Sequence, residues 1–487
     1  MLQPINRLPP EILSHIARCS FHREDKNALP LVPLTHVCWY WRESIISNPE
    51  NWALISDRNE DMAATSLERA KAAPLQISLS MKMVKKCPRL PNIITPHFQN
   101  VESFTVFLDP SFKDFTETFP TFPQSMPNLR SLSLTLYGGW ELSIDPFKGI
   151  THTLTCLSLY TVPLTPSLLK LRTLTNLTLH YSPFNLPLDT LLNFLEQNRS
   201  LRSASLRVDF VKPSLRRSRR RAPMENRLEY LQVDGHDPLD ARALISNIPL
   251  QKGAHLDIFY DFKELDNVFS GISTTHLSNL PSPNLMEYDT DPRHVQLYGP
   301  NGIFTLSYAL LSPFTNFVEF SLLPLANIQE FRLTHRRNFW TTRFNPIVFN
   351  PSSFPALKTI VIGLDTSMSR FFSALFSNPS SSPSLKTLVF LNCDLPEDFM
   401  KELRRFASDR MKTTSARLHS VLIIHKDGKF PSAASIHRLR SRVKAVDIRV
   451  DVKLPRGLIR RGVRFWQPHK WFLKHIRRLL CTNIIAQ

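Results

Sequence analysis

One acidic pair in the sequence has a spacing that suits metal chemistry, Asp289-Thr290-Asp291. Two carboxylates in a D-x-D arrangement are what a metal-dependent transferase uses on a nucleotide sugar, because hard divalent cations prefer oxygen ligands. Such an enzyme also needs a nucleotide-binding domain, yet the chain has neither a G-x-G-x-x-G nor a G-x-x-x-x-G-K-[ST] pattern. We therefore interpret the pair as part of a turn, with the metal site as the alternative.

The other residue types that commonly carry catalysis are present but scattered. The cysteines form no C-x-x-C pair, and the sixteen histidines show no ligand spacing. G-x-S-x-G and H-E-x-x-H patterns are missing too, so a nucleophile elbow and a zincin site lack support. The cysteines are Cys19, Cys38, Cys87, Cys156, Cys393 and Cys481. The sequence thus predicts no catalytic residue, no metal, no cofactor, no disulfide framework and no enzymatic activity.

The formal net charge of +19 is concentrated in two segments, an arginine run and the last 32 residues. We expect the run to lie in an exposed loop, where it could be a nuclear localisation signal, a contact for an acidic partner or a solvated segment. The run consists of Arg216, Arg217, Arg219, Arg220 and Arg221, and the last 32 residues contribute Arg456, Arg460, Arg461, Arg464, Lys470, Lys474, Arg477 and Arg478.

The basic C-terminal tail, residues 456–487, also contains aromatic and aliphatic side chains such as Trp466, Trp471 and Phe472. Basic residues interleaved with aromatics can bind nucleic acid or an anionic membrane surface. The same residues can form an amphipathic helix from about 471 to 480 that caps a repeat array, whose ends need covering. We favour the cap, because the apolar residues recur at helical spacing.

Two short amphipathic helices are predicted at the N-terminus. Pro9 and Pro10 suit a helix start, and Glu11 follows where the positive end of the helix dipole favours a carboxylate. One apolar stripe then contains Ile12, Leu13, Ile16 and Ala17, and a second contains Leu34, Val37, Cys38, Trp41 and Ile45. About fifty residues bury too little surface to be comfortably stable alone, so a partner is expected.

This N-terminal segment resembles the F-box. The similarity rests on Leu8-Pro9-Pro10-Glu11-Ile12-Leu13, Val37-Cys38-Trp39-Tyr40-Trp41-Arg42 and Pro49-Glu50-Asn51-Trp52-Ala53-Leu54-Ile55. The resemblance implies docking on the Skp adaptor of a cullin-RING ubiquitin ligase, with adaptor-binding residues Leu8, Pro9, Ile12, Leu13, Ile16, Leu34, Val37, Cys38, Trp41 and Ile45. Trp39 and Tyr40 stand where the family more often has polar or basic residues, and the segment 21–33 is longer than the usual helix connection. In the alternative interpretation, these residues close a small helical domain onto the rest of the chain.

The segment from Leu67 to Leu75 looks like the helix and proline stop that follow the box in many fungal F-box proteins. Beyond residue 100 a leucine-rich pattern, L-x-x-L-x-L, recurs. The starts from 129 to 228 are 20 to 27 residues apart and those at 328, 357 and 385 are 28 or 29 apart, as in leucine-rich repeats. The copies are 129/132/134, 154/157/159, 174/177/179, 201/204/206, 228/231/233, 317/320/322, 328/331/333, 357/360/362, 385/388/390, 418/421/423 and 443/446/448. Leu385–Leu395 also matches the longer form that ends in C-x-L. Unrelated strands of an α/β domain are the alternative.

Each repeat is expected to supply one strand whose leucines point inward, and stacking of the repeats creates the core. The residues between the leucines would then line a concave sheet that binds a target. From these residues we predict target-binding residues Tyr160, His180, Arg207, Tyr230 and Asp234. The stretch 252–310 is irregular, although Leu256/Ile258 and Leu285/Tyr288 could be degenerate repeats.

The predicted fold class is therefore α/β, a short N-terminal helical F-box followed by an irregular leucine-rich-repeat solenoid, or horseshoe, with a basic C-terminal cap or tail. The predicted domains are 1–55 (F-box-like), 56–98 (linker and coupling helix), 99–455 (repeats) and 456–487 (tail). The expected function is a substrate-recognition adaptor that binds an unknown protein target. The alternative is a basic scaffold that associates with nucleic acid or an anionic surface. Without a signal segment or a membrane-length apolar run, we expect the cytosol or the nucleus.

Overall fold

The structure is a computed structural model of the 487-residue chain. It describes residues 8–21, 31–108, 117–119, 122, 126–136, 153–162, 164–182, 187–208, 228–235, 238–248, 250–260, 285–289, 294–299, 302–308, 325–334, 354–363, 372, 375–393, 395–413, 417–425 and 430–450. Within this part the chain forms two compact units, one containing Met1–Leu79 and Met83–Asn100 and the other Ser80–Lys82 and Val101–Val450.

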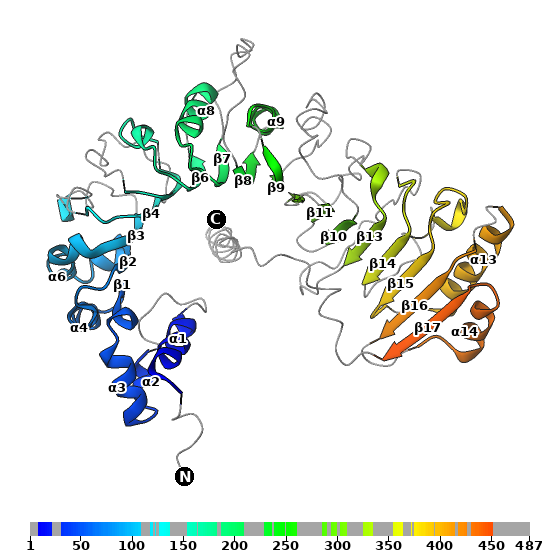
Figure 1. The fold of residues 1–487 in the computed structure, drawn as a ribbon, viewed down its shortest axis with the longest axis horizontal. Helices are drawn as coiled ribbons and strands as arrows, with labels where there is room; N and C mark the ends of the chain where they lie inside the picture. Colours follow the sequence, from blue (N-terminus) through cyan, green and yellow to red (C-terminus); the bar gives the residue numbers. More distant parts are fainter. Residues whose placement is uncertain are drawn as a thin grey trace, which may run out of the picture. The chain divides into compact units, whose positions relative to one another are not determined.

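The first unit is mostly helical (Figure 1). The helices and strands that lie wholly or partly in this unit are α1 (Pro10–Phe21), α2 (Leu31–Thr35), α3 (Trp39–Ser47), η2 (Pro49–Trp52), β1 (Leu54–Ser56), α4 (Glu60–Ala70), β2 (Leu75–Ser80), α5 (Met81–Val84), α6 (Leu90–Ile94) and η3 (Thr95–Asn100). The end of β2 and the first half of α5 belong to the second unit. β1 and β2 pair in parallel. We call α1 to η2 the head.

The head follows the two predicted apolar stripes with one correction. Helix α1 begins at Pro10, and the Pro9 carbonyl accepts hydrogen bonds from the backbone N–H groups of Ile12 and Leu13. The second stripe is divided between α2 and α3, so it is not one helix. Cys38 between them has extended backbone angles, with φ −162° and ψ 172°.

A buried hydrogen-bond network centred on Ser14, which we call the Ser14 joint, connects the helices of the head. Ser14 on α1 accepts hydrogen bonds from the side-chain amides of Asn48 (2.9 Å) and Asn51 (3.4 Å). The Asn51 amide and the Trp52 indole both donate to the Ile45 carbonyl, at 3.2 and 3.0 Å. Because Ser14, Asn51 and Trp52 are each at most 1% exposed, α1, α3 and η2 are fixed relative to one another.

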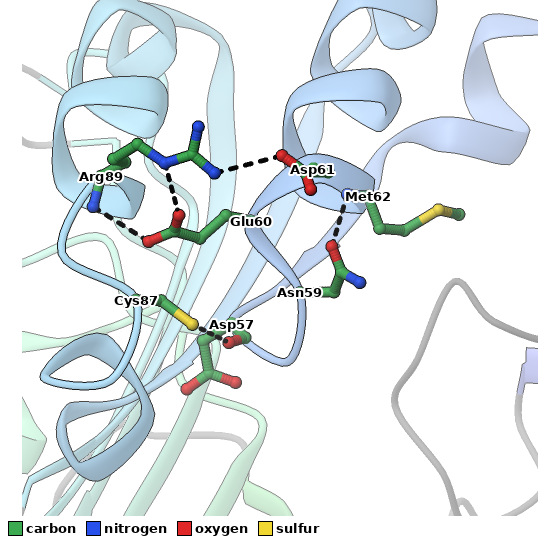
Figure 2. A network of polar contacts seen from close by, with 7 residues as sticks. All are labelled: Asp57, Asn59, Glu60, Asp61, Met62, Cys87 and Arg89. Atoms are coloured by element: carbon green, nitrogen blue, oxygen red, sulfur yellow. Dashed lines mark hydrogen bonds and ion pairs between the residues drawn. The ribbon is translucent and has the colours of Figure 1, made fainter.

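The region predicted as a linker and coupling helix is built into this unit. Arg69 on α4 places its guanidinium 4.3 Å from the centre of the Trp52 ring, so α4 contacts η2. Figure 2 shows how the start of α4 is held: Asn59 caps the Met62 N–H at 2.9 Å, and Arg89 binds Glu60 through its backbone N–H and its Nε. Residues 56–79 and 83–98 are therefore part of the first unit.

The second unit is an α/β assembly with a parallel sheet of many strands (Figure 1). Its strands are β3 (Val101–Leu108), β4 (Ser131–Leu136), β5 (Cys156–Tyr160), β6 (Asn176–Ser182), β7 (Ser203–Val208), β8 (Leu228–Gly235), β9 (Leu250–Tyr260), β10 (Leu285–Asp289), β11 (His294–Gly299), β12 (Gly302–Tyr308), β13 (Glu330–Thr334), β14 (Thr359–Gly363), β15 (Thr387–Leu391), β16 (Ser420–His425) and β17 (Ala445–Val450). The helices between strands are η4 (Leu168–Lys170), α8 (Leu188–Gln197), α9 (Pro238–Asn247), η6 (Leu325–Asn327), α13 (Glu397–Thr413) and α14 (Ala433–Arg440).

Equivalent positions of the predicted repeats lie opposite each other in the sheet. The strands from β3 to β9 pair in sequence order, and so do those from β13 to β17. One row of partners runs Phe104, Leu132, Leu157, Leu177, Ala204, Leu231 and Leu256, and a second runs Phe331, Ile360, Leu388, Val421 and Val446. These side chains are 0–3% exposed except Val446. The predicted α/β class is confirmed, and the strands of both series pair in parallel; the copy 317/320/322 lies outside the described residues.

The stretch 252–310 contains regular strands. β9 continues the parallel stack, with Leu256 and Ile258 fully buried. The next three strands form a meander in which β11 runs antiparallel to both β10 and β12. β12 pairs in parallel with β9, and β10 pairs in parallel with β13. The meander therefore connects the two series of strands with only β11 reversed.

Candidate functional site

The head exposes most of the large apolar side chains that lie at the surface of the described residues. Five of the six such side chains lie between the start of α1 and the start of α3, and the sixth is Met411. The five are Ile12 (46% exposed), Ile16 (38%), Val32 (38%), Val37 (53%) and Trp39 (75%). Isolated exposed apolar residues are common, but their concentration in a short segment is typical of a protein-binding surface.

The ten predicted adaptor-binding residues fall into two groups. Pro9, Ile12, Ile16 and Val37 are exposed, and Leu8, Leu34 and Cys38 are half-buried. Leu13 and Ile45 are fully buried and Trp41 is 5% exposed. These three side chains pack the head's own core, so they can support a docking surface but cannot form it in this conformation.

The five predicted target-binding residues all lie on one side of neighbouring strands. Tyr160, His180, Arg207 and Asp234 are consecutive partners across β5, β6, β7 and β8. Tyr230 lies four residues before Asp234 on β8. Side chains alternate between the two faces of a strand, so these residues point away from the leucine core.

A chain of hydrogen bonds links several of these side chains. Ser205 on β7 donates to the Gln232 side-chain oxygen at 3.0 Å, and the Tyr230 hydroxyl donates to the same oxygen at 3.1 Å. His180 Nε2 lies 2.8 Å from the Ser205 hydroxyl oxygen. Because the Ser205 proton is used on Gln232, Nε2 is the donor in this last bond. We call His180, Ser205, Gln232, Tyr230, Arg207 and Asp234 the polar cluster.

The electrostatics of the polar cluster follow from its enclosure. Arg207 Nη1 and Asp234 Oδ2 are 3.2 Å apart, with side chains only 10% and 6% exposed. Burial raises the pKa of the Tyr230 hydroxyl, and the negative charge of Asp257 raises it further. Burial also lowers the pKa of His255, whose ring lies 5.1 Å from the Tyr230 ring, to about 4.

This enclosure limits what the polar cluster can bind. His180, Ser205, Gln232, Arg207 and Asp234 are all below 10% exposed, whereas Tyr160 and Tyr230 are half-buried. In this conformation, the two tyrosines are the parts of the predicted target-binding set that a partner could reach. The other residues position them and hold neighbouring strands together.

Several predicted features cannot be placed. The arginine run Arg216–Arg221 and the tail 456–487 lie outside the described residues, as do Thr290 and Asp291. Asp289 ends β10, whose antiparallel partner β11 begins at His294. The described residues contain no group of three potential metal ligands. Among the described side chains, Cys38, Cys87, Cys156 and Cys393 form no disulfide. A helix suited to crossing a membrane is likewise missing from the described ranges.

Sequence reasoning missed His255 and Asp257, which lie on the same face as the polar cluster. The signal was present, because both residues alternate with the buried Leu256 and Ile258. Val32 was missed as well, since it precedes the first residue of the predicted second stripe. No protein-family model matches this chain, and a comparison with curated proteins found no significant relative.

Proposed function

We propose that this protein is a substrate-recognition adaptor that docks on the Skp adaptor of a cullin-RING ubiquitin ligase through its head and binds a target protein through its repeat sheet. The observation that carries the proposal is the concentration of exposed apolar side chains in residues 12–39. Leaving these residues in water forgoes stabilisation of about 25 cal/mol for each Å² of apolar surface that a partner would bury. An apolar groove on a partner would provide that burial.

The docking residues in this proposal are the exposed members of the predicted set together with two neighbours. Ile12 and Ile16 are four residues apart and so share a face of α1. Val37 and Trp39 lie at the junction of α2 and α3, and Val32 is on α2. Leu13, Trp41 and Ile45 act from inside, by fixing α1 against α3.

The target would contact the repeat sheet. Tyr160 and Tyr230 are the accessible aromatic residues of the polar cluster region, and tyrosine is enriched in protein interfaces because its ring is large and its hydroxyl can form hydrogen bonds. The proposal thus has three parts: the repeats form a curved solenoid, the solenoid binds a target, and the chain assembles into the ligase. Strand pairing supports a stacked repeat architecture.

Affinity capture of the full chain from cells tests the docking proposal. The double variant Ile12→Asp/Ile16→Asp should lose the Skp adaptor, because two carboxylates would be buried without partners in an apolar contact. Met411→Asp is the matched control: Met411 is 41% exposed on α13, and its variant should keep the adaptor. Capture of equal adaptor by the double variant and the wild type would refute the proposal.

A further inference from the structure

The residues that directly precede strands β14 to β17 form a row at the end of the sheet where these parallel strands begin. The backbone N–H of Lys386 donates to the Lys358 carbonyl at 2.8 Å, and the His419 N–H donates to the Lys386 carbonyl at 2.8 Å. The Ala445 N–H donates to the His419 carbonyl at 2.9 Å, so the residue before Ala445 continues the row. We call these four exposed residues, Lys358, Lys386, His419 and Lys444, the basic row.

The basic row has no acidic residue in the segments around it. The described segments that lead into the four strands contain no Asp or Glu; they are residues 354–358, 378–386, 417–419 and 441–444. Lys358 Nζ donates to the neutral side-chain oxygen of Gln329 at 3.0 Å. Arg417 donates from Nε to the Arg442 carbonyl (3.3 Å) and from Nη2 to the Val443 carbonyl (3.4 Å), which holds a further cation at the start of β17. These contacts orient the positive charges without neutralising them.

The corresponding row of the strands β3 to β8 is neutral. Arg130 pairs with Glu102 at 3.5 Å, and Arg202 pairs with Glu229 at 3.9 Å. The same pattern of backbone hydrogen bonds, at 2.8 Å, joins the residues of this row, which are Glu102, Arg130, Thr155, Thr175, Arg202 and Glu229. The repeats can therefore balance this position internally, and the basic row does not. Charge of one sign without internal compensation favours a partner of the opposite charge.

The spacing of the basic row matches an α-helix better than an extended peptide. Neighbouring strands lie about 4.8 Å apart, so the four positions span roughly 14 Å. Carboxylates on one face of an α-helix recur about every 5.4 Å, and four of them span roughly 16 Å. Same-face residues of an extended chain recur about every 6.7 Å and span roughly 20 Å. An acidic helix lying across the strands can thus place one carboxylate opposite each strand start.

We propose that the basic row is a docking surface for a helical protein segment that carries a stripe of carboxylates along one face. The inference goes beyond the adaptor function and uses no residue of the head. Binding of nucleic acid is the competing outcome. It usually adds base stacking on exposed aromatic side chains. The described segments around the basic row contain only one Phe, Tyr or Trp, and this residue, Phe354, is 2% exposed.

Fluorescence anisotropy of labelled peptides with the purified full chain tests the proposal. The stripe peptide is an alanine-rich helix with glutamates at i, i+4, i+7 and i+11. A second helical peptide carries four glutamates spread around all its faces, and a third alternates four glutamates with threonines, which favours an extended chain. The stripe peptide should bind at least about fivefold more tightly than either, because it alone aligns all four carboxylates with the row.

Paired variants locate the binding surface. Lys358→Gln/Lys386→Gln should weaken binding of the stripe peptide at least about fivefold. Arg130→Gln/Arg202→Gln is the matched control, because it removes two positive charges from the same positions of the neutral row; its affinity should change less than about twofold. All four replaced side chains are exposed, and circular dichroism verifies that both variants keep the fold.

Three results with the peptides would overturn the proposal. They are equal affinity for the three peptides, undiminished binding by Lys358→Gln/Lys386→Gln, and an equal loss in both double variants. The last would assign binding to general attraction by the net charge of +19. A single-stranded oligonucleotide with four phosphates is the remaining probe. If it binds more tightly than the stripe peptide and loses more affinity in Lys358→Gln/Lys386→Gln, the surface binds nucleic acid and not an acidic helix.

Discussion

Arg207 and Asp234 form an ion pair at 3.2 Å between partner residues of β7 and β8, and both side chains are almost completely enclosed. A second pair, Arg202 and Glu229, joins the starts of the same two strands at 3.9 Å but is 71% and 61% exposed. The two pairs thus offer an enclosed and an exposed version of the same connection.

A double-mutant cycle should distinguish the two pairs. For Arg207→Met and Asp234→Leu we expect a coupling energy of at least about 1.5 kcal/mol. Each single substitution removes this ion pair but leaves the charge of the other residue buried. For Arg202→Met and Glu229→Leu we expect about 0.2–1 kcal/mol, as for exposed pairs. Urea unfolding of the four single and two double variants measures both energies. Equal coupling in the two cycles would mean that enclosure does not strengthen the inner pair.

Substitution of Arg410 should lower the stability of the second unit strongly. Its guanidinium is fully buried and donates to the carbonyls of Pro379, Ser382, Pro383 and Leu385, which fixes the turn before β15 against α13. Arg410→Met removes these donors, and each buried acceptor left unsatisfied costs about 1–3 kcal/mol.

The matched control for Arg410 is Arg405→Met on the same helix. Arg405 is 85% exposed and forms a surface pair with Asp409, so its loss should cost less than about 1 kcal/mol. Thermal unfolding of both variants gives the comparison. Similar midpoints for Arg410→Met and the wild type would contradict the role of Arg410 as a clamp.

His255 should make stability fall on acidification. Burial holds its pKa at about 4, below the value of about 6.5 in an unfolded chain. As the pH falls, His255 therefore binds a proton in the unfolded state before it does so in the folded state. Its contribution to the unfolding free energy is complete above pH 6.5 and is lost as the pH falls toward 4. The unfolding free energy lost between these two pH values amounts to about 3 kcal/mol at most.

His255→Gln should flatten the dependence of the unfolding free energy on pH between 6.5 and 4. His437→Gln, at an exposed position of α14, is the matched histidine control. Denaturant unfolding at several pH values provides the test. A curve for His255→Gln that matches the wild type throughout this range would assign the acid sensitivity to other groups.

The contact between Arg69 and Trp52 should stabilise the first unit. Arg69→Ala should lower its unfolding free energy by about 0.5–1 kcal/mol, the usual contribution of a cation above an aromatic ring. Trp52→Ala should cost about 3–5 kcal/mol, since the ring is 1% exposed. Glu68→Ala, the exposed neighbour on α4, is the control. Tryptophan fluorescence follows unfolding of Arg69→Ala, and circular dichroism follows Trp52→Ala.

The strands of the second unit were predictable because their burial pattern is repeated. Leu132, Leu157 and Leu177 each stand at the same place in a recurring motif, and they are direct partners in the sheet. The copy on β3 was missed because positions 101, 104 and 106 hold valine, phenylalanine and valine where the motif has leucines. The meander β10 to β12 was missed because a reversed strand does not need the repeat period.

The head shows what periodicity cannot decide. On α1, Ile12 stands four residues before Ile16, and the adjacent Leu13 stands four residues before Ala17. The helix therefore has two apolar pairs at i, i+4 spacing. Leu13 and Ala17 are fully buried, while Ile12 and Ile16 are exposed. Helical spacing identifies both apolar faces, but which one is covered depends on where α3 packs. That packing arises from the Ser14 joint, which no local pattern reveals.

The most direct test of the docking account is calorimetric titration of the purified Skp adaptor into the purified full chain. We expect saturable one-to-one binding with a negative heat-capacity change, as apolar burial requires. Binding should disappear in Ile12→Asp/Ile16→Asp and persist in Met411→Asp. Absence of binding by the wild-type chain, or undiminished binding by the double variant, would contradict the account.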